Sequence, residues 1–80
     1  MKVVLYSKPD CPYCETAKTK LNQQNIQFFE FEFGRNADLN EFKEKYPEIR
    51  TVPAFFVDGV HIGGSNKLDA VIKMIGEANV

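Results

Sequence analysis

The chain has 80 residues, so it is near the lower size limit for a core without disulfide or metal support. Hydrophobic residues make up 44% of it and include seven Phe, and its net charge is −1. This charge argues against a nucleic-acid-binding surface or a basic membrane anchor. The N-terminus MKVVLYS is too short for a signal peptide, and no apolar run approaches the about 18–20 residues of a membrane span, so we expect one soluble cytoplasmic domain over residues 1–80.

A strand and a helix open the chain, and two cysteines lie where they meet. An apolar run predicts a buried strand over residues 2–6, and helical periodicity predicts a helix over residues 12–24, which Asn25 is suited to end. Cys11 then lies at the first turn of this helix, where unpaired backbone N–H groups and the helix dipole stabilise a thiolate. Cys14 lies further in and turns toward the apolar face. We predict an exposed, acidic Cys11 and a sheltered Cys14, as dithiol–disulfide exchange requires.

Three other interpretations compete with a redox pair. A structural disulfide closing so short a loop would contribute only roughly 2 kcal/mol in the chain-entropy model, and cytosolic reductants would tend to open it. A zinc site needs four ligands, whereas the chain offers two Cys and one His unless two chains share the metal, so we expect no metal. The third is a pair of incidental buried cysteines, against which the C-x-x-C spacing near a βαβ pattern favours redox chemistry.

Two charged residues of the loop before the cysteines bear on the thiolate. Lys8 lies three residues before Cys11, where a cation supports a thiolate or meets an anionic substrate; a solvated loop lysine is the alternative. Asp10 acts against the thiolate, because a neighbouring carboxylate raises the pKa of a thiol. We expect the helix start and Lys8 to outweigh Asp10 if its carboxylate points to water.

Phenylalanine and glutamate alternate in the next predicted strand, over residues 28–33. Such alternation is typical of an edge strand with one wet face, on which we place Glu30 and Glu32. The residues that we expect in the core are Phe29, Phe31 and Phe33.

A short helix follows this strand. Asp38 is suited to be its N-cap, with Glu41 at the third helical position as in a capping box, and Pro47 ends it. The residues on its apolar face are Leu39, Phe42 and Tyr46.

The last third of the chain predicts a hairpin and a final helix. Residues 54–57 and 60–62 read as strands joined by a two-residue Asp-Gly turn. Ser65 or Asn66 then caps a helix with an unbroken apolar face formed by Leu68, Val71, Ile72 and Ile75. The resulting order, βαβα and then ββα, predicts an α/β fold with a four-stranded mixed sheet and three helices on its two faces.

Three motifs on these elements resemble those of the glutaredoxin family of the thioredoxin fold. They are Lys8-x-x-Cys11-Pro12-Tyr13-Cys14, Thr51-Val52-Pro53 and Gly63-Gly64, and the likeness runs over nearly the whole chain. The resemblance implies a thioredoxin-like fold and glutathione-linked thiol–disulfide oxidoreduction, with Cys11 as nucleophile and Cys14 as resolving thiol. It also implies a cis bond between Val52 and Pro53.

The resemblance further implies a glutathione site. Its residues are Lys8, Tyr13, Thr51, Val52, Pro53, Gly64, Ser65 and Asn66. The backbone of Val52 would pair with an extended substrate beside Cys11, and the start of the last helix would bind a carboxylate through its N–H groups. Many relatives carry acidic residues after the two glycines, whereas this chain has Ser65-Asn66-Lys67, and we expect weaker glutathione binding.

Three functions are consistent with these residues. The first is a glutathione-dependent reductase of protein disulfides and glutathione mixed disulfides, which would supply electrons to ribonucleotide reductase as some relatives do. The second is an electron donor reduced by thioredoxin reductase. The third is a module in which two chains and two glutathiones hold an iron–sulfur cluster, and Pro12 disfavours it. We predict the first, acting as a monomer without nucleic-acid or membrane partners.

Overall fold

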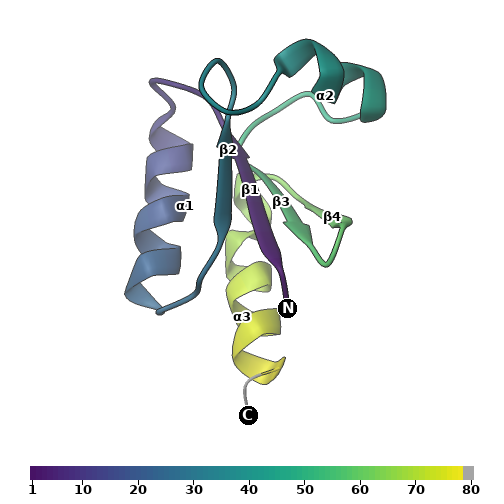
Figure 1. Cartoon of the computed structure of the whole chain (residues 1–80). Coiled ribbons are helices and arrows are strands. Elements are labelled where there is room, and N and C mark those ends of the chain that lie inside the picture. Colours follow the sequence, from purple (N-terminus) through teal and green to yellow (C-terminus); the bar gives the residue numbers. More distant parts are fainter. Residues whose placement is uncertain (79–80) are drawn as a thin grey trace.

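The computed structural model describes residues 1–78 and contains a four-stranded sheet with helices packed on it (Figure 1). The strands are β1 (Val3–Ser7), β2 (Phe29–Glu32), β3 (Ala54–Val57) and β4 (Val60–Gly63). The helices are α1 (Pro12–Gln23), α2 (Leu39–Lys45) and α3 (Leu68–Ala78), with a short 3₁₀ turn, η1 (Ser65–Lys67), directly before α3. The predicted element order is therefore confirmed.

The sheet is mixed, with spatial order β2-β1-β3-β4. β1 pairs parallel with β2, which the chain reaches through α1, and antiparallel with β3, while β3 pairs antiparallel with β4. Parallel neighbours need such a crossover, whereas antiparallel neighbours need only a tight turn. Asp58 and Gly59 make that turn with φ values of 51° and 82°, the left-handed conformations that a two-residue hairpin requires.

Two hydrophobic cores lie on opposite faces of the sheet, because successive side chains of a strand point in opposite directions. Buried residues of the first core, on the side of α1 and α3, include Val3, Leu5, Leu21, Phe55, Val57 and Val71. Buried residues of the second core, on the side of α2, are Phe33, Phe42, Ala54 and Phe56, with Tyr6 packed against them. Leu68, Val71 and Ile75 are buried as the periodicity of the last helix predicted.

Local signals placed most helix ends correctly. Asn25, just beyond α1, has φ 57°, the left-handed conformation expected of it. Asp38 caps α2: its Oδ1 accepts hydrogen bonds from the backbone N–H groups of Asn40 at 2.8 Å and Glu41 at 3.1 Å. The Asp38 cap supplies an acceptor for amides that have no partner inside the helix, whereas beyond α1 the N–H groups of Asn25 and Ile26 donate to helix carbonyl oxygens.

The start of the last helix differs from its prediction. Ser65 and Asn66 do not cap α3; they lie inside η1, and its own N-cap, Gly64, offers no side chain. The backbone N–H of Lys67 donates to the Gly64 carbonyl oxygen at 2.9 Å, an i→i+3 bond that tightens the turn to 3₁₀ geometry. The α-helix begins only at Leu68.

The edge strand β2 also departs from the prediction. Phe29 is 58% exposed, and the ammonium of Lys2 lies 5.4 Å from its ring centroid. α2 is short and lies at the other end of the row formed by Phe29, Phe31 and Phe33, where the ring of Phe33 lies 5.1 Å from that of Phe42. Glu30 is not on a wet face either, since its side chain is only 20% exposed against α1.

One residue of α2 is also more exposed than predicted. Leu39 was expected on the core face, yet it is 42% exposed at the first position of the helix. Phe42, one turn later, fills the core instead.

No helix in the described part of the chain combines the length and the apolar character needed to cross a membrane.

Candidate active site

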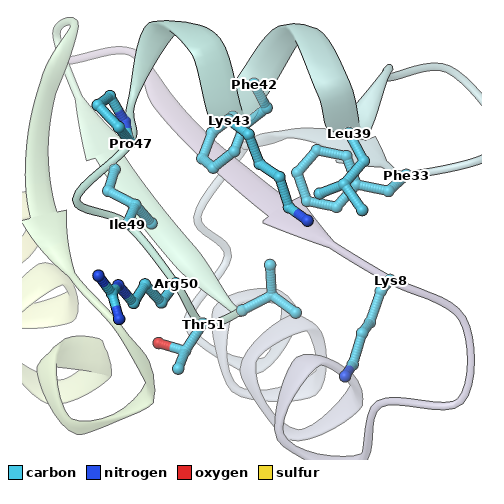
Figure 2. A pocket seen from close by; sticks show the side chains of 10 residues that line it. Lys8, Phe33, Leu39, Phe42, Lys43, Pro47, Ile49, Arg50 and Thr51 are labelled. Carbon is cyan, nitrogen blue, oxygen red and sulfur yellow. The ribbon is translucent and has the colours of Figure 1, made fainter.

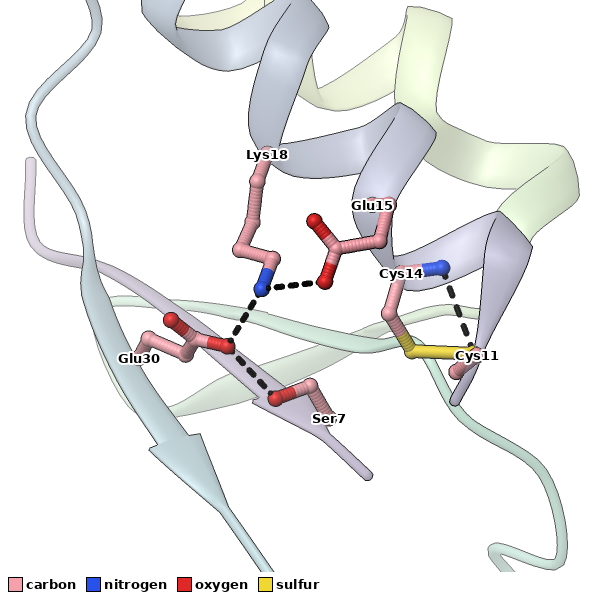
Figure 3. The surroundings of a disulfide bond; sticks show 6 residues. All are labelled: Ser7, Cys11, Cys14, Glu15, Lys18 and Glu30. Carbon is pink, nitrogen blue, oxygen red and sulfur yellow. Dashed lines mark hydrogen bonds and ion pairs between the residues drawn. A yellow bond between two sulfur atoms is a disulfide. The ribbon is translucent and has the colours of Figure 1, made fainter. Parts of the chain in front are cut away.

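The two cysteines lie at the start of α1, directly after the loop that leaves β1. Cys11 is the N-cap of the helix, Pro12 is its first residue, and Cys14 lies within its first turn. The two form a disulfide with their Cα atoms 5.2 Å apart, so the structure represents the oxidised protein (Figure 3). The predicted strand-to-helix junction is thus confirmed.

The sulfur of Cys11 caps the N-terminus of α1. Its Sγ accepts a hydrogen bond from the backbone N–H of Cys14 at 3.2 Å, the role that a Ser or Asp oxygen plays at other N-caps. A sulfur in this position faces the positive end of the helix dipole. Both interactions favour the charged over the neutral form of a thiol, so the geometry stabilises a thiolate at Cys11.

The exposure of Cys11 is lower than predicted. Cys11 is 6% exposed and Cys14 is 1% exposed, so the expected order holds, but neither thiol is open to solvent. The reason is that the Cys11 sulfur is turned toward the helix. There it is bonded to the Cys14 sulfur and accepts a hydrogen bond from the Cys14 backbone N–H. The two charged residues of the preceding loop, Lys8 and Asp10, are both exposed.

The motif around Pro53 contacts the glycine motif. The Val52–Pro53 peptide bond is cis, as the resemblance implied, and Pro53 is fully buried. Gly64 lies against this bend: a methyl group on its Cα would be 3.6 Å from the Pro53 carbonyl oxygen and 3.7 Å from the Thr51 hydroxyl. The cis-proline segment and Gly64 are therefore close neighbours, with space between them for about one methyl group.

The remaining predicted site residues lie around this contact. Lys8 lines the same pocket as Thr51 and Val52. Ser65 and Asn66 follow Gly64 in η1, which contacts α1 and so the helix that carries the cysteines. Tyr13 is 68% exposed beside the pair. The three motifs predicted from the sequence thus lie on segments that the fold brings together.

The Glutaredoxin family model matches residues 3–62, which include the cysteine pair and the cis-proline segment. The chain belongs to the glutaredoxin family. Glutaredoxin 3 of Escherichia coli (strain K12) is 39% identical over 69 residues, which cover 86% of this chain and 83% of that protein. Cys11 and Cys14 are thus the redox-active pair of a glutaredoxin, a family of thiol–disulfide oxidoreductases.

Solved structures agree with this membership. A structure of glutaredoxin 1 from Francisella tularensis, complexed with cacodylate, has a TM-score of 0.79 at 34% identity and covers 95% of this chain and 96% of its own. A buckwheat glutaredoxin–glutathione complex has a TM-score of 0.72 at 27% identity and covers 92% and 78% respectively. The thioredoxin-like arrangement of sheet and helices is shared throughout these matches.

Sequence reasoning missed a polar network behind the cysteines of this glutaredoxin (Figure 3). The buried Ser7 hydroxyl donates a hydrogen bond to Glu30 Oε2 at 2.8 Å, and Lys18 Nζ lies 3.1 Å from the same oxygen. Lys18 also pairs with Glu15 at 2.9 Å. The network ties α1, one turn after Cys14, to the edge strand β2. The alternation of Phe29, Glu30 and Phe31 showed that Glu30 lies on the face opposite the phenylalanines, but we expected that face to be wet and not covered by α1.

Electrostatics of this network favour its charged form. Burial alone would raise the pKa of Glu30, but hydrogen bonds from Ser7 and Lys18 and the charges of Lys18 and Arg35 outweigh it, and the pKa falls below its usual value. The pKa of Lys18 is raised, first by its hydrogen bond to Glu15 and then by its pairing with Glu30. Within residues 1–78, no group of three or more His, Cys, Asp or Glu side chains has the arrangement of a metal site.

Proposed function

We propose that this glutaredoxin is a glutathione-dependent reductase of protein disulfides and glutathione mixed disulfides, with Cys11 as nucleophile and Cys14 as resolving thiol. The observation that carries the proposal is the hydrogen bond from the Cys14 amide to Cys11 Sγ at the helix N-terminus, 3.2 Å long. It stabilises negative charge on one sulfur of the pair and not on the other. Such asymmetry gives the two thiols different roles.

The reaction balances as two exchange steps. The Cys11 thiolate attacks a substrate disulfide in line; a mixed disulfide forms, and the departing sulfur leaves as a thiolate that solvent protonates. Cys14 then loses its proton to solvent and attacks the Cys11 sulfur, which releases the second substrate thiol. Two electrons have passed to the substrate, and the Cys11–Cys14 disulfide is the product form of the enzyme. Two glutathione molecules reduce it and leave as glutathione disulfide.

The glutathione-binding roles are part of this proposal. β3 begins at Ala54, so the backbone groups of Thr51 and Val52 precede the ladder, and in this proposal they pair with an extended peptide such as glutathione beside the bend at Pro53. Gly64 leaves room for a ligand along this segment because it has no side chain. The buckwheat relative, solved as a glutathione complex, supports the same ligand class.

Side chains around this segment complete the proposed site. Lys8 would attract a carboxylate of glutathione, and Tyr13 would flank the bound tripeptide; both are exposed and free to do so. Ser65 and Asn66 would meet the γ-glutamyl end next to Gly64, because they follow it directly in η1.

The cellular setting follows from the chemistry. Glutathione reduces dithiol enzymes in a reducing compartment, and we place this protein in the cytoplasm, acting as a single domain and a monomer. Ribonucleotide reductase is the protein substrate proposed by the resemblance to relatives that supply it with electrons. No metal or nucleic acid takes part in the proposed reaction.

The deciding experiment compares two reductants for the oxidised protein. Glutathione with glutathione reductase and NADPH should restore the dithiol and support continuous turnover, whereas thioredoxin reductase with NADPH should not. Protein carrying Cys11→Ser serves as the background control in both assays. Efficient reduction by thioredoxin reductase together with none by glutathione would contradict the proposal.

A further inference from the structure

A pocket of about 710 Å³ opens between α2 and the segment that leads to the cis-proline (Figure 2). Its apolar walls come from α2 and from the segments just before and after it in the sequence. The residues that form them are Phe33, Leu39, Phe42, Pro47, Ile49 and Val52. Leu39 is 42% exposed, so part of this apolar surface faces solvent in the free protein.

Cations surround this apolar surface. Of the described residues that line the pocket, Lys8, Lys43 and Arg50 are basic, and none is acidic. Lys43 reaches from α2 into the middle of the pocket, with Arg50 on one side and Lys8 on the other (Figure 2). The chain as a whole has a net charge of −1, so this concentration of positive charge is local. A ligand that complements the pocket has an apolar part beside a carboxylate.

The pocket is continuous with the proposed substrate site. Thr51 and Val52 line it, and they are also the residues whose backbone we place against an extended substrate. A chain paired there as an added strand advances about 3.3–3.6 Å per residue, so its next residues reach the pocket. Glutathione carries carboxylates but no apolar side chain, so it leaves the exposed surface of Leu39 uncovered. A polypeptide substrate can supply both groups.

We propose that this pocket binds an extended segment of the protein substrate, taking one of its apolar side chains against Leu39 and Ile49 and a neighbouring carboxylate at Lys43. The inference rests on the function proposed above and adds a substrate preference to it. Disulfides flanked by an apolar and an acidic residue are reduced in preference to those flanked by basic residues. The exchange chemistry at Cys11 is unchanged; only the affinity for the polypeptide differs.

Three synthetic peptides test this preference. Each has one intramolecular disulfide, and they differ only in the two residues after the first cysteine: leucine–aspartate, leucine–lysine or serine–aspartate. With glutathione as reductant, kcat/KM for the leucine–aspartate peptide should exceed that for the leucine–lysine peptide about three- to fivefold at low salt, and less at high salt. It should exceed that for the serine–aspartate peptide about fivefold.

Two variants assign these preferences to the pocket. Lys43→Glu should invert the preference for aspartate over lysine, whereas Lys20→Glu, an equal charge change on α1, should keep it. Leu39→Ser should abolish the preference for leucine over serine and keep that for aspartate over lysine. Because Leu39 is partly exposed at a helix start, we expect this variant to fold, and its thermal unfolding is measured alongside.

The outcomes separate this inference from the proposed function. The glutathione mixed disulfide of free cysteine has no polypeptide to fill the pocket and reports the function alone. A wild-type protein that reduces it but treats the three peptides alike overturns the pocket proposal only, and one that reduces no substrate overturns both. Equal shifts in Lys43→Glu and Lys20→Glu also overturn it, as would a homodimer in sedimentation that Leu39→Ser dissociates, since a second copy would then occupy the pocket.

Discussion

α1 and η1 contact each other, yet their starts are built differently. α1 begins with a side chain that caps it, because Cys11 Sγ accepts a hydrogen bond from the Cys14 backbone N–H. η1 has Gly64 as its N-cap and no side-chain cap, and Gly64 leaves only enough space beside Thr51 and Pro53 for a methyl group. One helix start thus carries the sulfur that we propose as the nucleophile, and the other leaves space for a ligand. Substitutions at the two helix starts should therefore affect reaction chemistry and ligand access separately.

The largest effect on activity is expected from substitution of Cys11, which caps α1 and is also the proposed nucleophile. Cys11→Ser should abolish all disulfide reductase activity, because the attacking sulfur is lost, but it should leave the reduced protein folded, because a Ser oxygen also caps a helix well. Turnover of a small glutathione mixed disulfide and thermal unfolding of the reduced protein measure the two effects. Residual turnover above the uncatalysed rate would contradict the assignment of Cys11 as nucleophile.

A second change at the same helix should remove only part of the activity. Cys14→Ser should keep the reduction of small glutathione mixed disulfides, because glutathione itself can resolve the intermediate, and lose that of protein disulfides, which need both thiols. The two rates are measured on the same preparation, with wild type as control. Equal loss of both would show that the roles of the two cysteines are assigned wrongly.

The features that the sequence predicted well depend on neighbours along the chain. The N-terminal position of Cys11, the cap at Asp38 and the hairpin turn at residues 58–59 follow from side chains within a few residues of each other, and all were found. The cis bond before Pro53 came only from the family resemblance, since X–Pro bonds are cis in only about 5–6% of cases.

The features that it predicted poorly depend on which elements meet in three dimensions. Periodicity placed Phe29 and Leu39 on apolar faces, but α2 is too short to cover the whole row. The low exposure of Cys11 and the partners of Glu30 require the register of α1 against the sheet, which no local pattern encodes. Ser65 has the side chain of a good cap, yet the i→i+3 bond from Lys67 to Gly64 draws it into a 3₁₀ turn.

A matched pair of substitutions at Gly64 tests the space beside the second helix start. A methyl group there meets Pro53 and Thr51 at 3.6–3.7 Å, ordinary contact distances, so Gly64→Ala should fold and raise the KM for glutathione only slightly. Gly64→Val adds bulk over the same segment and should raise that KM about tenfold, a loss of about 1.4 kcal/mol of binding. Unchanged KM values in both variants would place glutathione elsewhere.

A smaller effect is expected from the charge at the end of η1. Lys67 should repel the ammonium of the γ-glutamyl group, so Lys67→Asp should lower the KM for glutathione about two- to fivefold, as expected for exposed charges. The effect should shrink at high salt, because ions screen exposed charges. A KM that rises in this variant at low salt would instead make Lys67 a ligand of the glutathione carboxylate.

The last prediction concerns stability instead of activity, through the network that fixes α1 to β2. Glu30→Gln should lower the free energy of unfolding by about 1 kcal/mol at neutral pH, because it weakens the pairing with Lys18 and the hydrogen bond from Ser7. Glu15→Gln is the matched control, since its side chain is 72% exposed, and its effect should be smaller. Denaturant unfolding of the oxidised proteins measures both.

The pH dependence of this difference has a definite sign. The pKa of folded Glu30 lies below its ordinary value of about 4.3, so its charged form stabilises the fold above that value, and this contribution is lost as the pH falls through the lower, folded-state pKa. The stability gap between wild type and Glu30→Gln should therefore be full at neutral pH and close in acid. Glutamine keeps the size of the side chain but not its charge, so a gap that stays constant down to pH values below the folded pKa would assign the effect to altered hydrogen bonding and not to charge. The ion pair of Glu30 with Lys18 would then contribute nothing to holding α1 against β2.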